Sequence, residues 1–340
     1  MQKNNKYVKI KILKTVQICY NLISIRNSEV KMSIFSIGEV IRKQRNLLGI
    51  SQEELANGIC SVSTLSRIEN GERVPNKANF DALMQRMGQS GEMYDVYIGD
   101  NDFEIHEKKF YIRQAVMCGS SENARVLLEE LKAVVQNNDT LTMQFIEYME
   151  VLIESAEIKT EAEIKRLETA LRMTVSEYGH AKLCNCLLTF DDITIINNIA
   201  NAYGNINNYR KAINLFYELK EYLDTRYINS EEIMRTYPLL LYNLSKWLGL
   251  EGRYAECVEM CDLGIKLSSE SGRSKLLGKL LYNKAWCIVK RGNVENEHEL
   301  ARTLLQAYYV LTTMNDSATA QKIKDFGLSN CHLLKETFYF

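Results

Sequence analysis

One short segment of the chain, residues 62–70, gathers hydrogen-bonding side chains on one side of an expected helix. Leu65 and Ile68 fall on the other side and must pack inward. The outward face carries small groups, polar groups and one arginine: Val62, Ser63, Ser66, Arg67 and Asn70. The Arg67 guanidinium can donate two hydrogen bonds to guanine, whereas hydroxyls and a valine methyl group discriminate weakly between bases. We expect Arg67 to read a base edge, worth about 1–3 kcal/mol of discrimination; the alternative is that it pairs only with phosphate.

The residues that flank this segment carry the signals needed to position it. Ser51 can cap a helix whose third residue is Glu54, which makes a capping box. A short turn at 58–60 follows, Ser61 can cap the next helix, and Gly71 ends that helix. Two short helices joined by a tight turn, the second with a free polar face, predict a helix-turn-helix that enters the major groove of DNA.

The segment 36–88 resembles helix-turn-helix repressors of the lambda-Cro/Xre type over its whole length. The resemblance rests on SQEELA at Ser51–Ala56, on STLSRIENG at Ser63–Gly71, and on Pro75 before the closing helix. It implies an internal ion pair between Arg45 and Glu69. It also implies a set of DNA contacts: a backbone phosphate for Gln52, base edges for Val62, Ser63 and Arg67 with Ser61, Thr64 and Ser66 beside them, and phosphates on the far side for Asn70 and Lys77.

Charge limits how strongly a single copy of this domain can hold DNA. The whole chain has a net charge of −1. Within 36–88, seven basic and six acidic residues leave 7 − 6 = +1. Attraction to nucleic acid must therefore be local. Because two copies side by side double the phosphate contacts, we expect a homodimer.

Other kinds of chemistry find no support in the residue pattern. The nine cysteines contain no CxxC pair, and no histidine lies at ligand spacing to the two close pairs, Cys184–Cys186 and Cys257–Cys261, so we expect no metal site. Cys257 and Cys261 are expected to be small buried residues. Gly272–Lys279 differs from a phosphate-binding loop because it has five residues between its glycines and is followed by Leu280. We predict no enzyme activity and no cofactor, and, with no secretion signal, reduced thiols in the cytoplasm.

The N-terminal residues 1–33 form a basic leader. Six more basic than acidic residues occur in the first 31 positions, and the apolar stretches between them are too short for a membrane span. Two interpretations compete: a DNA-contacting arm, or an upstream start with true initiation at Met32. We favour the second interpretation, since the domain begins directly after Met32.

The rest of the chain predicts paired helices. With only two prolines and no strand alternation, an all-α protein is expected. IINNIANAY, LLYNLSKWL and LLYNKAWCI align without gaps from Ile195, Leu240 and Leu280, at offsets of 45 and 40 residues. Small residues recur in the helices that follow, at Ala212, Cys257 and Ala301. Such periods indicate an α-solenoid of about five helix pairs resembling tetratricopeptide repeats. We predict a helix-turn-helix domain at 34–90, a linker at 91–101 and the repeats at 102–340.

The first helix of each pair lines the concave surface of such a superhelix, and equivalent positions there predict a peptide groove. An asparagine ladder can bond an extended peptide backbone, Lys246 can hold a carboxylate, and aromatic rings can cover apolar side chains. The predicted peptide-binding residues are Asn198, Asn201, Tyr242, Asn243, Lys246, Tyr282, Asn283 and Trp286. The alternative is that the asparagines bond the turns and backbone of the solenoid itself.

A helix-turn-helix domain followed directly by helical repeats resembles the RNPP group of cytoplasmic peptide-sensing regulators of Gram-positive bacteria. The domain order and the last three repeats carry this resemblance. It implies a homodimer on a two-fold related DNA operator, with a short signalling peptide in the groove. Two alternatives stay open: an adaptor whose repeats bind a partner protein, and a repressor that needs no ligand and uses its repeats for oligomerisation.

Overall fold

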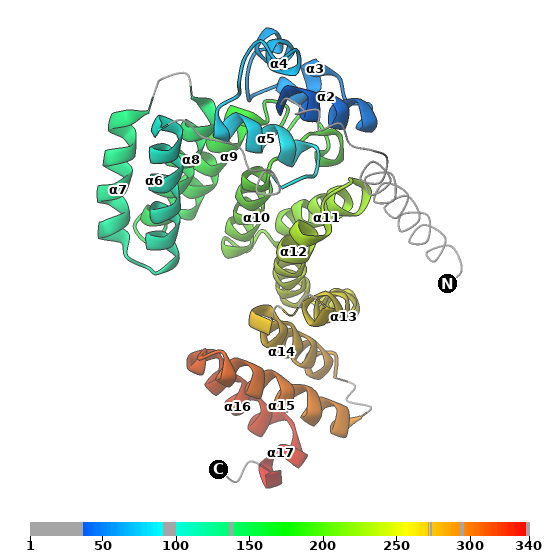
Figure 1. Ribbon diagram of the computed structural model, residues 1–340. Helices are drawn as coiled ribbons and strands as arrows, with labels where there is room; N and C mark the ends of the chain where they lie inside the picture. Colours follow the sequence, from blue (N-terminus) through cyan, green and yellow to red (C-terminus); the bar gives the residue numbers. More distant parts are fainter. Residues whose placement is uncertain are drawn as a thin grey trace, which may run out of the picture.

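A computed structural model describes residues 37–90, 100–135, 139–270, 272, 274–292 and 296–337. These residues form helices, and none of them lies in a β-strand. The first four helices are α2 (Ile37–Leu48), α3 (Gln52–Ala56), α4 (Val62–Glu69) and α5 (Lys77–Arg86). The remaining helices form an array of stacked pairs, and the expected all-α class is confirmed (Figure 1).

Hydrogen-bonding caps fix the starts of the short helices. The Ser51 hydroxyl accepts from the Glu54 N–H at 3.1 Å, and the Glu54 carboxylate accepts from the Ser51 N–H at 2.8 Å, so the predicted capping box is present. The Ser61 hydroxyl caps α4 by accepting from the Thr64 N–H at 3.1 Å. Asn76 caps α5 in the same way. Each cap satisfies a backbone donor that the first turn leaves unpaired, and contributes about 1 kcal/mol.

The helix-turn-helix domain has its own apolar core. Leu65 and Ile68 of α4 are buried, as their spacing predicts. They pack in one cluster with residues from the three other helices: Ile41, Leu55, Ala56, Phe80, Leu83, Met84 and Met87. Burial of each large side chain contributes about 1.5–3 kcal/mol, and this core fixes the orientation of the outward face of α4.

Within the described residues the array has six helix pairs, whereas the sequence predicts about five. The first helices are α6 (Asp100–Met117), α8 (Thr140–Glu154), α10 (Phe190–Asn205), α12 (Ser230–Leu250), α14 (Ser274–Lys290) and α16 (Ser317–Asn330). The second helices are α7 (Ser121–Val134), α9 (Thr160–Thr174), α11 (Tyr209–Thr225), α13 (Tyr254–Glu270), α15 (Glu297–Thr313) and α17 (His332–Thr337). A short 3₁₀ turn, η2 (Leu183–Asn185), precedes α10.

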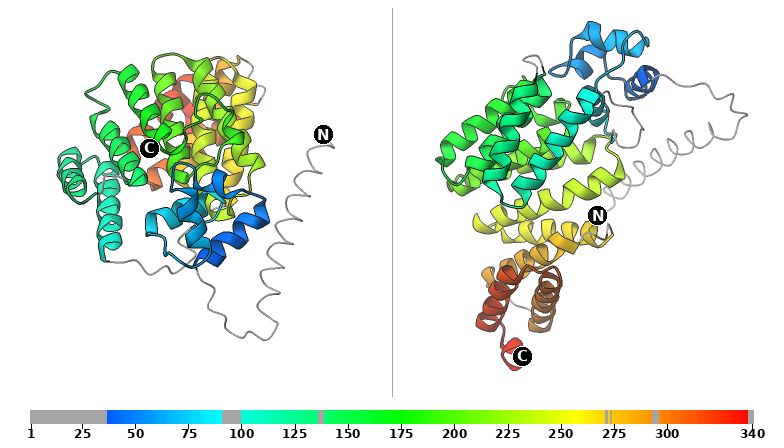
Figure 2. Two further views of the ribbon diagram at one scale, coloured as in Figure 1. Left: turned by 90° about the horizontal axis from the view of Figure 1, so that it is seen from above. Right: turned by 60° about the vertical axis from the view of Figure 1, so that its left-hand side comes forward.

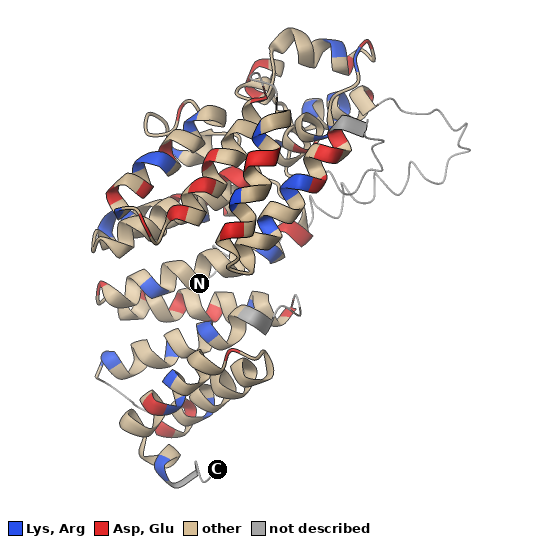
Figure 3. Ribbon diagram, turned by 90° about the vertical axis from the view of Figure 1, so that its left-hand side faces the viewer, with Lys and Arg blue, Asp and Glu red and all other residues tan. Residues whose placement is uncertain are grey.

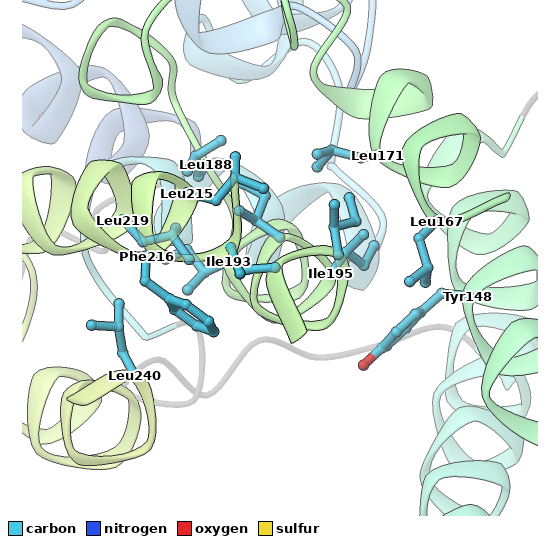
Figure 4. Close-up of a cluster of buried hydrophobic side chains, with 14 of the residues drawn as sticks. Tyr148, Leu167, Leu171, Leu188, Ile193, Ile195, Leu215, Phe216, Leu219 and Leu240 are labelled. Atoms are coloured by element: carbon cyan, nitrogen blue, oxygen red, sulfur yellow. The ribbon is translucent and has the colours of Figure 1, made fainter. Parts of the chain in front are cut away.

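Packing between successive helices explains the recurrence of small residues. Ala212, Cys257 and Ala301 are all buried between neighbouring helices, as predicted, and Cys261 is buried too. The array core runs from the first pair to α14, and part of it is drawn in Figure 4, where Phe216 and Leu219 of α11 face Ile193 of α10. A second cluster joins α14 and α15 to the final pair. The final pair therefore closes the end of the array.

The helix-turn-helix domain is docked on the array at the end that holds α6 to α11 (Figure 1, Figure 2). The Asn229 N–H donates to the Gly88 carbonyl at 2.6 Å, and the Phe190 N–H donates to the Gln85 side chain at 3.1 Å. Gly88 has φ +74°, and a Cβ there would lie 1.9 Å from the Tyr227 carbonyl oxygen. This position therefore requires glycine both for its backbone conformation and for the close approach.

Arg86, at the end of α5, is a buried charged group at this junction and is 5% exposed. Its guanidinium donates to the carbonyls of Leu55 and Asn57 in its own domain and to that of Thr174 in α9, the last at 2.9 Å. Burial lowers the pKa of Arg86, which the nearby Asp192 opposes. One side chain thus ties the helix-turn-helix to the array.

Some sequence predictions concern parts of the chain that lie outside the described residues. These are the basic leader and most of the predicted linker at 91–101. Among the helices that are described, none is both long and apolar enough to cross a membrane.

Candidate DNA-binding face and ligand groove

Helix α4 presents its predicted outward face to solvent. Ser63, Arg67 and Asn70 are exposed, and Val62 is 40% exposed although it is apolar. No described residue accepts a hydrogen bond from the Arg67 guanidinium or pairs with it. The arginine is therefore available to an external acceptor, and it stands on a helix whose opposite face is fixed by Leu65.

Hydroxyl groups at the start of α4 are linked to one another. The Ser61 oxygen lies 2.9 Å from the Ser63 hydroxyl and 2.8 Å from the Thr64 hydroxyl. Because Ser61 also caps the helix, its side chain has a structural role whether or not it touches DNA. Ser66 is half-buried on the same helix.

Gln52 belongs to a network behind the DNA-binding face. Its amide donates to Glu69 at 2.7 Å, and Arg45 donates to both oxygens of the same carboxylate at 2.6 and 2.8 Å. The predicted Arg45–Glu69 pair is thus present. Burial raises the pKa of Glu69, but the hydrogen bonds from Arg45 and Gln52 outweigh it and lower the pKa overall. The network holds α4 against α2 and α3, and a phosphate contact from Gln52 stays a prediction.

Lys77, which is predicted to contact a DNA phosphate, is already paired within the protein. Its ammonium pairs with Asp81 one turn later on α5 at 2.7 Å, and its side chain is only 12% exposed. It also lies 5.8 Å from the centre of the Phe80 ring. A phosphate contact from Lys77 would require it to exchange this partner, whereas Arg67 needs no such exchange.

The three repeated asparagines of the predicted groove follow one rule: each donates to the preceding first helix of the array. Asn198 of α10 donates to the Tyr148 hydroxyl of α8 at 2.8 Å. Asn243 of α12 donates to Asn197 of α10 at 2.9 Å. Asn283 of α14 donates to Ser245 of α12 at 3.0 Å. Their amide donors fasten the first helices together, which accounts for the repeat, and peptide contact at these positions stays a prediction.

Aromatic and basic residues one turn further on also have partners in the array. Asn201 accepts from the Trp247 indole N–H at 2.8 Å, and the Lys246 ammonium lies 3.9 Å from the centre of the Trp247 ring. Burial lowers the pKa of Lys246. Trp286 is half-buried, with its ring centroid 6.3 Å from that of Tyr254.

The two predicted groove tyrosines serve packing as well. The Tyr242 carbonyl accepts from Asn283 at 3.4 Å, and the Tyr282 ring meets Phe326 of α16 edge to face at 5.6 Å. Phe326 thereby helps the last pair to close the array.

One polar group on the first helices was missed by sequence reasoning. Asp191 and Asp192 both fit helix-start charges, and Asp192 does complete a capping box with Thr189. Asp191, however, accepts two hydrogen bonds from Arg113 of α6, at 3.0 and 2.9 Å. No local pattern marks this pair, because its partners lie 78 positions apart.

Charge on the array is mixed. Figure 3 shows Lys and Arg interspersed with Asp and Glu along the array helices. In the part of the chain that the structure describes, no group of three or more Cys, His, Asp and Glu residues is arranged to hold a metal ion.

The sequence matches the model of the RNPP family C-terminal domain over residues 113–323 and a helix-turn-helix model over residues 41–92. No curated protein is similar enough to count as a match.

Two solved structures similar to this chain are those of PlcR from Bacillus thuringiensis. The complex of PlcR with the peptide PapR7 and DNA has a TM-score of 0.55 and 22% identity, and the match covers 85% of this chain and 99% of the PlcR chain. Apo PlcR has a TM-score of 0.55 and 19% identity, over 86% and 98% of the two chains. At these identities the likeness supports the fold alone.

Proposed function

This chain belongs to the RNPP family, and from that premise we propose that it is a transcriptional regulator whose DNA binding is controlled by a short signalling peptide. The two family matches place it among DNA-binding regulators and not among enzymes. We keep the predicted domains, 34–90 for DNA and 102–340 for the repeats, as part of the proposal.

The proposal that this chain binds DNA rests on the exposure and the fixed orientation of α4. Its outward face is exposed, Arg67 has no partner among the described residues, and Leu65 and Ile68 hold the helix in a fixed orientation. A guanidinium presented in this way can donate two hydrogen bonds to guanine in the major groove. Arg67 therefore serves as the principal reader of sequence, with Ser63 and Val62 beside it.

Charge supports action as a homodimer, and a cytoplasmic location is part of the proposal. The helix-turn-helix segment has a net charge of +1, so a single copy offers little overall electrostatic attraction to DNA. Two copies on a two-fold related operator would double the phosphate contacts and read two half-sites about one helical turn apart.

Control by a peptide draws support from the family match and from the docking of the two domains. The solved PlcR complex contains a peptide and DNA together. In this chain, Arg86 and Gly88 join the helix-turn-helix to α9 and to the loop after α11. A rearrangement of the array at these two points would therefore change the position of the DNA-binding domain. A peptide that binds one arrangement better than another would shift DNA binding; equal affinity would shift nothing.

Affinity selection of random genomic duplexes at near-physiological salt tests the proposal of sequence-specific DNA binding. Wild-type protein should enrich one palindromic sequence, and Arg67→Ala should lose it. Arg210→Ala is the matched control, because Arg210 is exposed on α11, outside the helix-turn-helix domain. Enrichment that is equal in wild type and Arg67→Ala would contradict sequence reading by α4, and would favour an adaptor whose helix-turn-helix binds DNA without specificity.

A further inference from the structure

Two basic side chains of α6 meet an aromatic ring of α8 on the side of the array that the first helices share. The Lys109 ammonium lies 5.4 Å from the centre of the Phe145 ring, and the Arg113 guanidinium lies 4.9 Å from it. Phe145 is 3% exposed, so the ring is a fixed floor for both cations. Lys109 and Arg113 are four residues apart and therefore lie on one face of α6.

The two cations differ in their partners. Arg113 is held by both oxygens of Asp191, which keeps the pKa of that carboxyl below its usual range although burial opposes this. For Lys109, no described residue places a carboxylate within ion-pair distance of the ammonium. Burial lowers the pKa of Lys109 to about 8, against the weaker opposing fields of Asp139 and Asp191. A half-buried ammonium without a close counter-ion gains from an anion brought to it.

The neighbouring surface is suited to a peptide. On the adjoining face of α6, Phe103, Phe110 and Met117 recur every seven residues and are 57%, 57% and 83% exposed. An exposed apolar stripe next to an unpaired cation complements a short peptide that carries apolar side chains and a carboxylate.

We propose that Lys109 is the carboxylate-binding residue of the peptide groove, with Arg113 positioned beside it by Asp191 and with the apolar stripe of α6 covering the adjacent peptide side chains. This inference rests on the proposed peptide control. It assigns binding of the peptide carboxylate to the first helix of the array. The sequence analysis instead predicts Lys246 for that role. The carboxylate belongs either to the peptide C-terminus or to an acidic side chain.

The site also borders the DNA-binding domain. Helix α5 packs against α6 and α8, and Asp81 of α5 contributes to the field at Lys109. A peptide carboxylate at Lys109 would add a negative charge close to Asp81 and to the docking surface of α5. Occupancy of the groove thereby alters the energy with which the helix-turn-helix is docked.

Affinity selection from synthetic peptides, read by mass spectrometry, tests the assignment with the full chain. Two pools of short random peptides would be identical except that one ends in a free carboxylate and the other in an amide. Lys109→Met should weaken binding of the selected peptides about tenfold or more, as expected for loss of a charge-assisted hydrogen bond. The matched control, Lys266→Met at a 70% exposed position of α13, should leave their affinity unchanged. Enrichment from only the free-acid pool would identify the C-terminal carboxylate, and enrichment from both pools would identify an acidic side chain.

A zero-length crosslink provides a readout that does not depend on the folding of a variant. A carbodiimide joins a peptide carboxylate to a lysine amine as an amide, with water transferred to the reagent as a urea. The linked tryptic fragment of wild-type protein should contain Lys109.

The outcomes of these experiments distinguish the Lys109 subsite from the broader proposal of peptide control. Linkage at Lys246, or equal peptide affinity in wild type and Lys109→Met, would overturn the Lys109 subsite and leave peptide control standing. Failure of wild-type protein to select any peptide would overturn both.

Discussion

The DNA-binding face and the groove side of the array present their polar residues in opposite ways. On α4, the outward side chains such as Arg67 are exposed, and the Arg67 side chain makes no hydrogen bond or ion pair with the residues that the structure describes. Along the array, Asn198, Asn243 and Asn283 are each committed to a neighbouring helix. A periodic polar residue can therefore mark a binding face in one region and an internal tie in another. Substitutions should affect binding in the first region and stability in the second.

The largest effect is expected from loss of the carboxylate that supports the DNA-binding face. The Glu69 side chain is 1% exposed and pairs with Arg45. Because Glu69→Ala would leave the Arg45 charge without its partner, it should destabilise the helix-turn-helix domain by about 3–5 kcal/mol. Urea denaturation followed by circular dichroism would measure this. A change below about 0.5 kcal/mol would place Glu69 among ordinary surface residues.

The Glu69 carboxylate also makes the stability of the protein depend on pH, and the sign of this dependence follows from the lowered pKa of Glu69. A group with a lowered folded-state pKa stabilises the protein above its unfolded pKa, and this stability is lost as pH falls through the folded value. Wild-type stability should thus decline on acidification below the ordinary glutamate range, and Glu69→Gln should flatten part of the decline. An identical acid profile in both proteins would contradict the role of this pair.

The next largest effect is expected at Arg67, and it should appear only in binding. Arg67→Ala should cost about 1–3 kcal/mol of discrimination between the operator and a duplex changed at the contacted guanine. Thermal stability should stay within about 0.5 kcal/mol of wild type, because the side chain is exposed. Fluorescence anisotropy with both duplexes checks this. Equal weakening on both would reassign Arg67 to phosphate.

Asn243 should behave in the opposite way to Arg67. The side chain is 7% exposed, and Asn243→Ala would leave the Asn197 oxygen without its donor. We expect a loss of about 1–3 kcal/mol in array stability from the unsatisfied group. Urea denaturation of this variant alongside Leu250→Ala, a change at an exposed position of the same helix, would measure the difference. If Asn243→Ala kept its stability but lost peptide binding, the result would instead support the prediction that the repeated asparagines bond the peptide backbone.

The smallest effect is expected at the cap of α4. Ser61→Ala removes the acceptor for the Thr64 N–H and should cost about 1 kcal/mol of stability, whereas Ser61→Gly should cost only a few tenths. Operator binding should weaken no more than the loss of folded protein explains. Specific loss of operator affinity in folded Ser61→Ala would show that this hydroxyl also touches DNA.

The helix-turn-helix could be predicted from sequence because its determinants are local. The caps at Ser51 and Ser61 bond partners three residues away, and Leu65 and Ile68 show the buried face by spacing alone. Even the Arg45–Glu69 pair, which joins different helices, followed from the resemblance of a short continuous segment. The partner of Lys77, one turn away on the same helix, was not foreseen.

The candidate groove could be predicted only in outline. Helix pairs follow from repeat periods, but the chemistry of the groove depends on which distant residues the superhelix brings together. Arg113 pairs with Asp191, and Lys109 lies beside Phe145, on different helices. The repeat period of a sequence does not give the rotation of one helix relative to another, so these contacts could not be predicted. The repeat at Asn198, Asn243 and Asn283 was visible in the sequence, yet its purpose depended on neighbours in the preceding pair.

The most direct test of peptide control is the affinity of the protein for its selected operator, measured with and without a selected peptide at fixed salt. Linkage requires that the peptide change operator affinity by some factor, and that the operator change peptide affinity by the same factor. Our account predicts a reciprocal factor of about 5–150, the usual range of such coupling. Operator affinity that is identical at zero and at saturating peptide would contradict the account.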